Sequence, residues 1–465
     1  MTPTLTAVLA FLVLQFGVGI WVSRRIKNEA DYLVAGRKLG GLLATFSIFA
    51  TWFGAETMVG SSGSAYREGL TPASAEPFGY GLCLIGMGLI FAIPLWRREL
   101  TTLADLYRQR YSVLVERVAA VILIPGSILW SAAQIRAFGH VLSTSASALE
   151  VNTAIAIGAG LVVGYTMFGG LLADAVTDLM QGVVLVIGLV LLLVGTIGLL
   201  GGFQQAVDAA TTSGKIKVVI SDSVSVLDTV EAWAIPVLGS LVTTEMVGRI
   251  IATRTPEIAR RASIAAGCMY ITIGLIPVFI GIVGADLVSS VADSEQLMAV
   301  VARRALPTLG YAIFAGSLTS AILSTVNSTL LIASGLMSHN LIIPTLGITN
   351  ERTKVVLARA GVALFGVIAY VLAVRSLGVF ALVEQASAVG STGALVTITF
   401  GLFTRFGGPR TALATLTLGL VSYLVASYGN VPHPFLLSFG VALASYLLGG
   451  MLEHVLTQER RATAA

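Results

Sequence analysis

The stretch ATWFGAETMVGSSGSAYREG, residues 50–69, decides the fold of this chain. It follows an apolar run, LLATFSIFA (42–50), at a depth where a membrane helix should stay apolar, yet it carries a tryptophan, Glu56, two threonines, three serines and four glycines. Segment 51–63 therefore has the composition of a helix break. Backbone that leaves the helix inside a membrane must be buried in protein or line a water-filled cavity, where its carbonyl oxygens can coordinate a cation. Close helix packing against the small residues is the alternative.

A second segment carries a similar interruption. In AWAIPVLGSLVTTEMVGR (232–249), Pro236 and Gly239 stand within an otherwise apolar span. The two interrupted spans are the second and the seventh in our count, five helices apart. Interruptions at corresponding positions of two halves are typical of transporters built from inverted repeats, whose broken helices meet near the middle of the membrane.

The composition of the whole chain is that of a polytopic α-helical membrane protein. Of its 465 residues 56% are hydrophobic and 11% are charged, and the mean hydropathy is +0.90. A typical soluble protein has about twice that charged fraction. Runs of about 20 apolar residues predict thirteen membrane spans within one membrane domain, 1–465. The predicted limits are 4–23, 40–68, 75–96, 118–146, 151–168, 172–200, 230–251, 262–287, 307–341, 354–374, 378–402, 409–427 and 433–455.

The distribution of basic residues predicts the orientation. Of the 28 Lys and Arg residues, 21 fall in one set of alternate loops or the C-terminal tail, six fall in the other set, and Arg136 lies within a span. The larger set includes Arg249, at the end of the seventh span. Because cytoplasmic loops are enriched in Lys and Arg, we expect the N-terminus outside and the C-terminus in the cytoplasm. The net charge of +4 then reflects these loops, and we expect no nucleic-acid partner.

Two further polar features lie in apolar surroundings. The span at 307–341 contains Ser324, Thr325, Asn327 and Ser328, whose oxygens suit a hard monovalent cation. Hydrogen bonding between helices is the alternative use of such a cluster. Asp178 begins another span, and an acid at that depth indicates a functional site unless it is simply solvated. The sequence has no P-loop, HExxH motif or Cys/His metal spacing, so we expect neither an enzyme nor an organic cofactor.

The sequence resembles the solute:sodium symporter family. The resemblance is carried by DYLVAGRKLGGL (31–42) with the GSSGSAYREGL that follows it, by GGLLADAVTDLMQG (169–182), similar to the family pattern GG(L/M)xAVxxTDxxQ, and by AILSTVNSTLLIASGLMSHNL (321–341). It implies a LeuT-type fold with two inverted five-helix repeats and Na⁺-coupled symport across the plasma membrane. The implied parts are an extra N-terminal helix and loop (4–38), the repeats (39–200 and 230–402) and two C-terminal helices (409–455).

The same resemblance implies where Na⁺ binds. The implied first site consists of the carbonyl oxygens of Ala50, Phe53 and Ala321 and the hydroxyls of Ser324 and Thr325. A second Na⁺ site is described for some members of the family. The matching positions here are Asp178, Ser324, Asn327 and Ser328, with asparagine in place of a hydroxyl residue.

The solute is expected beside the broken helices. The candidate residues are Trp52, Glu56, Thr57, Glu76, Tyr80, Trp130, Gln134, Thr243, Thr244, Glu245 and Gln385. ATWFG (50–54), EPFGYGLCL (76–84) and ILWSAAQIRAFG (128–139) resemble the choline transporter branch, which implies an aromatic cage of Trp52, Tyr80 and Trp130. Aromatic faces suit a quaternary ammonium, which has no N–H to donate.

One departure and several alternatives stay open at this stage. Thr243 stands where that branch has another cage tryptophan. Glu56 and Glu245 could pair with an ammonium group or with Arg136. An amino acid, a sugar or a carboxylate is the alternative solute, and a receptor that binds its solute without transport is the alternative class of protein.

Overall fold

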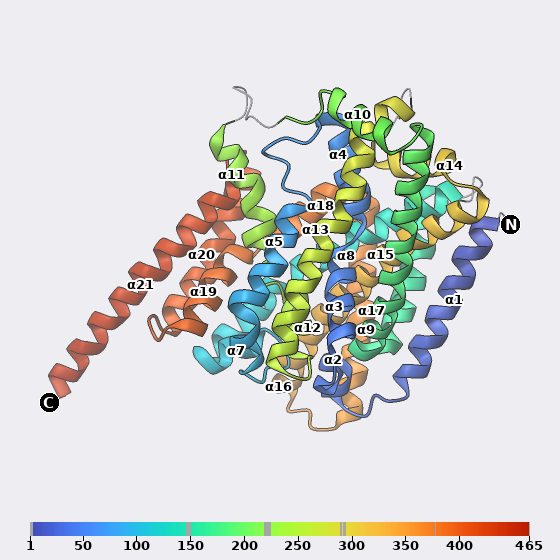
Figure 1. Cartoon of the computed structure of the whole chain (residues 1–465). Coiled ribbons are helices and arrows are strands. Elements are labelled where there is room, and N and C mark those ends of the chain that lie inside the picture. Colours follow the sequence, from blue (N-terminus) through green and yellow to red (C-terminus); the bar gives the residue numbers. More distant parts are fainter. Residues whose placement is uncertain are drawn as a thin grey trace.

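The computed structural model describes residues 3–145, 150–217, 225–288, 291, 294–376 and 378–464, and this part of the chain is helical apart from its connections. Figure 1 shows a bundle in which α10 and α14 lie at one end and α7 and α16 at the other. The N-terminus lies towards the first end, and α21 carries the C-terminus towards the second. The predicted outer side corresponds to the end with α10 and α14.

The helices match the predicted spans closely in position. The first half contains α1 (Pro3–Ser23), α2 (Glu29–Val34), η1 (Ala35–Arg37), α3 (Gly41–Trp52), η2 (Glu56–Gly60), α4 (Ser61–Glu68), α5 (Phe78–Gly86), η3 (Met87–Phe91), α6 (Ala92–Trp96), α7 (Ala104–Arg110), α8 (Val113–Ser145), α9 (Val151–Leu199) and α10 (Phe203–Thr212). The second half contains α11 (Val226–Ala234), η4 (Ile235–Gly239), α12 (Thr244–Ile251), α13 (Pro256–Leu287), η5 (Ser294–Gln296), α14 (Leu297–Ala305), α15 (Thr308–Gly335), η6 (Leu336–Ile342), α16 (Ile343–Leu346), α17 (Glu351–Arg375), α18 (Val379–Ala388), α19 (Ser391–Phe403), α20 (Pro409–Tyr428) and α21 (Pro434–Ala464).

The number of spans stays a prediction. Among the described residues, ten helices are long and apolar enough to cross a membrane, or eleven if the bent pair formed by α3 and η2–α4 counts as one. The other two predicted spans, 4–23 and 151–168, coincide with α1 and with the first part of α9. All thirteen predicted segments are thus helical, but length and composition support eleven of them as spans.

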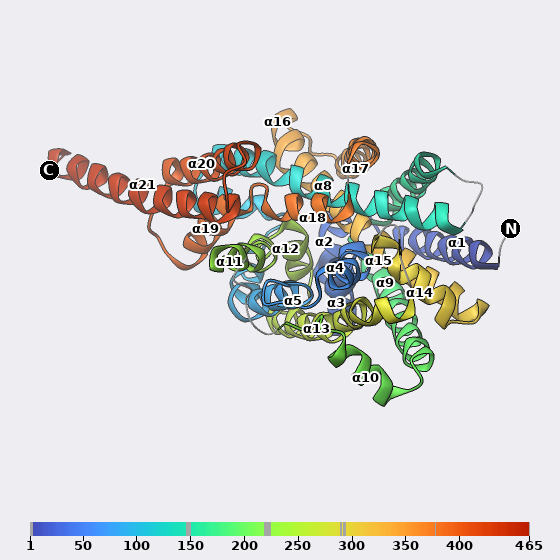
Figure 2. The ribbon, with the colours of Figure 1, turned by 90° about the horizontal axis from the view of Figure 1, so that it is seen from above.

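Both predicted helix breaks are present. The interrupted span predicted at 40–68 bends by 55° between α3 and η2, where the backbone of Phe53 lies outside the helical region. In the second, the π-helical turn η4 ends at Gly239, and helix resumes at Thr244 after an extended Thr243. The short polar and glycine residues named from the sequence therefore do interrupt these helices. In the end-on view of Figure 2, α3, α4 and α12 lie in the middle of the bundle, with α1 and α21 at opposite extremes.

A third interruption was not predicted. The expected span 378–402 consists of two helices, α18 and α19, separated at Val389 and Gly390. Gly390 has a φ of +74°, which side chains disfavour, and a Cβ atom there would lie 2.8 Å from Cγ2 of Ile122. A single glycine in an apolar run gives too little signal to distinguish this break from an ordinary helical glycine.

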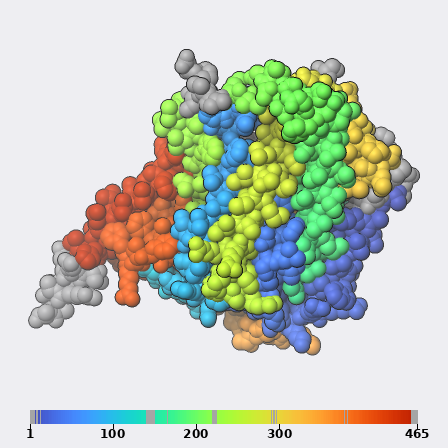
Figure 3. Space-filling view, in the orientation of Figure 1, coloured from blue at the N-terminus to red at the C-terminus, as the bar shows by residue number. Residues whose placement is uncertain are grey.

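Helix α15 is among the most enclosed helices of the bundle. In the most apolar window of Thr308–Leu346, 83% of the residues are buried, against 28% for Pro434–Leu456 in α21. The peripheral helix α21 therefore presents most of its surface to the surroundings, while α15 is enclosed by other helices. Figure 3 shows α13, in yellow-green, exposed on one face between segments from the blue and green parts of the chain. The two halves of the sequence are thus interleaved in space.

Gly170 separates the two predicted spans, 151–168 and 172–200, that together form α9. Its φ of +59° and ψ of 177° lie outside the helical region, and a Cβ atom there would come within 3.0 Å of the Tyr32 carbonyl oxygen. We expect Gly170→Ala to lower stability by about 1–3 kcal/mol, because such a conformation is strained for any residue with a side chain. Thermal unfolding of the purified protein measures this. Gly160→Ala, with no atom within 4 Å of the new Cβ, is the control in the same helix and should be neutral or stabilising. Equal melting temperatures for the two variants would contradict the prediction.

Candidate functional site

The broken end of α3 lies against α15, where the sequence predicted the first Na⁺ site. The hydroxyl of Thr325 donates to the Thr51 carbonyl oxygen at 2.9 Å and to the Ala321 carbonyl oxygen at 3.2 Å. Ala50, Phe53, Ala321, Ser324 and Thr325 are all fully buried. These bonds bring together oxygen atoms of Thr51, at the helix break, and of Ala321 and Thr325 on the facing helix, in a region closed to solvent. This donor set suits a small cation without redox chemistry. Thr51 was not among the predicted ligands.

Asp178 on α9 lies at the same junction. Its two carboxylate oxygens accept hydrogen bonds of 2.5 Å from the hydroxyl of Ser324 on α15 and from that of Ser47 on α3. Asp178 is fully buried, so it does not belong at a solvated interface. Ser324 was assigned to both predicted Na⁺ sites, and its hydrogen bond links the carboxylate directly to the first of them.

Arg249 lies beside Asp178, which the sequence analysis did not anticipate. Its fully buried guanidinium donates through Nη2 to Asp174 Oδ2 at 2.7 Å, and the same nitrogen lies 3.5 Å from Asp178 Oδ2. Nη2 also donates to the hydroxyl of Ser328, and Nε donates to the hydroxyl of Ser47 at 3.1 Å. Arg249 was counted among the loop charges of the cytoplasmic side. That assignment is wrong for this residue, because it turns inward from α12 to two aspartates of α9.

The predicted second Na⁺ set is brought together only in part. Ser328 donates to Asp174 at 3.0 Å and lies in the Arg249 cluster with Asp178. Asn327 instead accepts a hydrogen bond of 2.5 Å from Thr166 of α9. It lines a very small cavity of about 10 Å³ together with Thr166 and Asp174. Asn327 therefore lies next to the cluster rather than within the group around Asp178.

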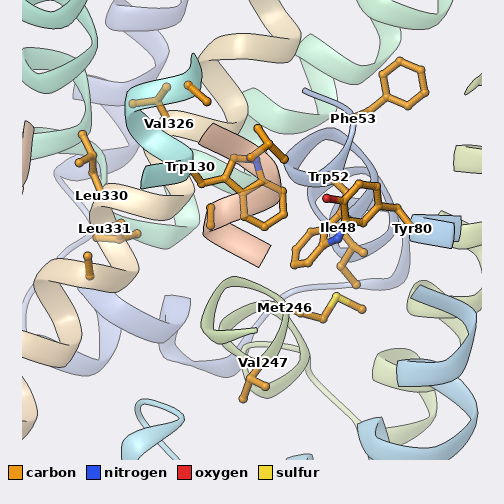
Figure 4. Close-up of a cluster of buried hydrophobic side chains, with 14 of the residues drawn as sticks. Ile48, Trp52, Phe53, Tyr80, Trp130, Met246, Val247, Val326, Leu330 and Leu331 are labelled. Carbon is orange, nitrogen blue, oxygen red and sulfur yellow. The ribbon is translucent and has the colours of Figure 1, made fainter. Parts of the chain in front are cut away.

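Three aromatic residues that were predicted to form a cage lie next to one another (Figure 4). The ring centroids of Trp52 and Trp130 are 5.6 Å apart with the rings at 74°, and those of Tyr80 and Trp130 are 6.3 Å apart. The rings come from the last residue of α3, from α5 and from α8. They touch each other in this structure, so an ammonium group can enter only if the rings separate. Phe53, at the same break, points away from this group.

Glu56 lies directly against the aromatic group. Its Oε1 accepts from the Trp130 indole at 3.3 Å, and its Oε2 accepts from the Gln134 amide at 2.6 Å. The other end of the Gln134 amide accepts from the backbone of Ala55 at 3.0 Å. Both carboxylate oxygens thus accept hydrogen bonds from N–H groups. A Cβ atom on Gly54 would lie 2.5 Å from Oε2 of Glu56, so this glycine leaves room for the arrangement.

A cavity of about 430 Å³ runs from the end of the bundle with α11 to Glu56. Its lining includes Tyr80 of the aromatic group and five acidic residues, against the single basic residue Arg67. The acidic residues are Glu56, Glu68, Glu76, Asp228 and Glu384. Such an excess of one sign of charge raises the local concentration of cations.

A second, smaller cavity of about 30 Å³ lies on the other side of Trp130. Thr243, Thr244 and Glu245 line it at the break between η4 and α12. The carboxylate of Glu245 accepts from the hydroxyls of Ser127 and, at 3.1 Å, of Thr244. Tyr80 lines the larger cavity and Trp130 lines the smaller one, so the aromatic group lies between the two, with Thr243 on the smaller cavity.

The remaining residues named from the sequence lie in different surroundings, and not all of them reach a cavity. Thr57 shares a hydrogen bond with the hydroxyl of Tyr270, which also lies 3.3 Å from Glu76 Oε1. Gln385 is exposed and is absent from the lining of both cavities; its neighbour Ser387 is the residue that bonds to Tyr80, at 3.0 Å. Arg136 donates to the Ala373 carbonyl oxygen at 3.0 Å, so the structure does not pair it with Glu56 or Glu245.

The residues of these clusters that the sequence analysis missed include Asp174, Arg249, Tyr270 and Ser387. Asp174 carried a usable signal, because it stands where the family pattern quoted above has valine. A charged residue at such a position indicates a partner elsewhere in the membrane domain. Tyr270 and Ser387 gave none, since single hydroxyl-bearing residues are common in apolar spans.

Comparison with known proteins identifies the family. The sequence profile of the sodium:solute symporter family matches residues 32–419. The chain belongs to this family.

Relatives of this symporter chain include two kinds of transporter. High-affinity choline transporter 1 of Caenorhabditis elegans is 24% identical over 410 residues, 81% of this chain and 70% of the relative. The human high affinity choline transporter 1 is 26% identical over 72% of this chain, which spans 61% of the relative's length. The sodium/pantothenate symporter of Escherichia coli K12 is 24% identical over 95% of this chain and 94% of the relative.

Solved structures with a similar fold are also transporters. A Na⁺-coupled sialic acid symporter in a substrate-bound outward-open state matches with a TM-score of 0.83 at 17% identity, over 97% of both chains. Mhp1, a nucleobase-cation-symport-1 family transporter, matches with a TM-score of 0.61 at 14% identity, over 92% of this chain and 95% of that one. The fold is therefore of the LeuT type, as predicted. The symporter chain is a multi-pass plasma-membrane transporter and not an enzyme, and its family supports Na⁺-coupled uptake of a small solute.

Proposed function

We propose that this symporter imports a small organic cation, with choline or a related quaternary ammonium as the best candidate, together with Na⁺. The observation that carries the proposal is Glu56, a buried carboxylate that accepts hydrogen bonds from Trp130 and Gln134 next to three aromatic rings. A carboxylate beside aromatic faces provides both charge compensation and cation–π contacts of about 2 kcal/mol each when desolvated. The acidic lining of the larger cavity favours entry of a cation.

The alternative solutes fit this site less well. A carboxylate solute would bring a negative charge next to Glu56 and Glu76 without a basic partner among the cavity residues near the rings, since Arg67 lies within 4.0 Å of Glu68 at the exposed rim. A sugar or a zwitterionic amino acid gains less from a buried carboxylate than a cation does. A receptor without transport remains the alternative from another class, and solute accumulation distinguishes the two.

The proposed mechanism is alternating access. Na⁺ at the junction of α3 and α15 stabilises the state whose cavity is open on the side of α11, and substrate binding closes that side before the inner side opens. A charge moving through 100 mV contributes about 2.3 kcal/mol, and a tenfold Na⁺ gradient contributes about 1.4 kcal/mol. The two together drive solute accumulation of several hundred-fold per Na⁺.

The first test is uptake of labelled choline into proteoliposomes with and without an inward Na⁺ gradient. We expect accumulation that depends on the gradient. Choline that binds to the purified protein but never accumulates would favour the receptor. Absence of both binding and uptake, in protein that Na⁺ still stabilises against heating, would reject choline as the solute while leaving Na⁺ binding in place.

The aromatic group provides a specific prediction. Trp52→Ala should raise the choline concentration for half-maximal uptake by about ten- to thirtyfold, the equivalent of about 1.4–2 kcal/mol of lost cation–π contact. Trp21→Ala on α1 is the control, because this tryptophan is 57% exposed and far along the chain from the cavity residues. Uptake by the Trp21 variant should be unchanged. The same half-saturation concentration in both variants would rule out the cage.

A further inference from the structure

The buried cluster around Arg249 brings carboxylates and a guanidinium together. Two carboxylates, Asp174 and Asp178, face one guanidinium, and all three side chains are at most 4% exposed. Glu245, one turn earlier on α12, has its carboxylate bonded to Ser127 and Thr244 at the smaller cavity. With both aspartates ionised, a single guanidinium leaves the cluster with one uncompensated negative charge, which is costly in a buried site unless a further cation balances it.

That remaining charge lies next to the proposed Na⁺ site. Asp178 Oδ1 accepts a hydrogen bond of 2.5 Å from Ser324, and Ser324 is one of the proposed Na⁺ ligands. A single Na⁺ bound there makes the sum of the four charges zero. A second Na⁺ in the same cluster would leave one positive charge in excess.

The guanidinium also lies among the side chains that a second Na⁺ would need. Arg249 donates to the hydroxyl of Ser328, to that of Ser47 and to Asp174, and lies 3.5 Å from Asp178. Asp178 and Ser328 belong to the set assigned to a second Na⁺ from the sequence. The guanidinium is thus hydrogen-bonded to one of these two residues and within ion-pair distance of the other.

We propose that Arg249 is a built-in cation that takes the place of a second Na⁺, and that Asp174 is the counter-ion that holds it there, so the protein binds one Na⁺. The inference rests on the proposed Na⁺-coupled symport. It assigns Asp174, which replaces a valine of the family pattern, a role in setting the number of coupled ions. Asp174 acts through Arg249 and is a positioning residue.

Binding of ²²Na⁺ to the purified full-length protein tests the inference without knowledge of the solute. We expect saturation at one ion per protein. Arg254→Gln is the matched control, because Arg254 lies five residues further on and is exposed, and it should also bind one ion. Two ions bound to the unaltered protein would overturn the inference.

Three variants change the charge of the cluster in different directions. Arg249→Gln leaves two uncompensated carboxylates, and we expect two bound Na⁺. Asp174→Asn makes the cluster neutral without Na⁺, and the apparent affinity for Na⁺ should fall at least tenfold. Asp174→Asn combined with Arg249→Gln restores the original charge sum and should bind one ion.

The variants keep the test decisive even if one of them does not fold. If Arg249→Gln is unstable, the affinity of Asp174→Asn alone decides, and a value equal to that of the unaltered protein would overturn the inference. One ion bound to a folded Arg249→Gln variant would do the same. Failure of the proposed function looks different: the unaltered protein would then bind no ²²Na⁺ and show no gradient-dependent uptake.

Discussion

Replacing Glu56 by glutamine is expected to reduce choline uptake at limiting substrate by about 30-fold or more. The substitution removes the charge that compensates a desolvated cation while it keeps the size of the side chain. Loss of one partner from a buried charge pair typically costs about 2–5 kcal/mol, and 2 kcal/mol corresponds to roughly 30-fold in affinity. Initial rates of labelled choline uptake over a range of choline concentrations measure this effect, which should appear mainly as a higher half-saturation concentration.

The hydrogen bonds of Glu56 suggest a compensating variant. A glutamine at position 56 would place an amide N–H₂ group opposite the N–H donors of Trp130 or Gln134, which now bond to the carboxylate at 3.3 and 2.6 Å. Exchanging the two residues, as Glu56→Gln with Gln134→Glu, restores one charge and one amide to the same pair. Uptake by this double variant should recover at least in part.

Glu68, at the rim of the cavity, tests whether contact with the solute or the overall charge of the cavity determines affinity. Glu68 lines the same cavity, but its side chain is 67% exposed. Solvent screens a charge at such a site, so Glu68→Gln should change the half-saturation concentration by less than about threefold. A loss of uptake in Glu68→Gln as large as in Glu56→Gln would mean that overall cavity charge, rather than contact with the solute, determines affinity.

The sequence predicts the fold of this symporter well because the relevant signals are local. Breaks at 51–63 and 232–249 follow from glycine, proline and short polar residues inside apolar spans, and both are observed. The break before α19 depends on the positive φ of Gly390 and its contact with Ile122. That contact joins residues far apart in the chain, so nothing in the neighbouring sequence distinguishes this glycine from others.

The sequence predicted only those parts of the site where the residue type is itself unusual in the middle of a membrane span. Tryptophans and a glutamate in the middle of spans indicated a polar site, and the structure groups Trp52, Glu56 and Trp130 there. Arg249 lies five residues before the loop residue Arg254, and a count of loop charges cannot reveal that it turns inward. Only the tertiary structure brings its side chain from α12 to Asp174 of α9.

Replacing Thr325 by alanine is expected to raise the Na⁺ concentration for half-maximal uptake by at least about tenfold. In the present structure its hydroxyl bonds to the carbonyl oxygens of Thr51 and Ala321, so it holds the broken end of α3 against α15 and is a proposed ligand. Its removal deletes a neutral oxygen from the site and leaves a buried carbonyl group without a donor, each worth about 1–3 kcal/mol.

Na⁺ dependence of uptake at saturating choline measures this shift, and a matched threonine provides the control. Thr319 lies on the same helix, is fully buried and donates to the Ala315 carbonyl oxygen of its own helix at 2.9 Å. Thr319→Ala removes the same chemical group without touching α3, so its Na⁺ dependence should stay within about twofold of the unaltered protein. A Thr325→Ala variant with normal Na⁺ dependence would place the ion elsewhere. A parallel loss in both variants would mean that the hydroxyls support helix packing rather than the ion, because packing is the one property the two positions share.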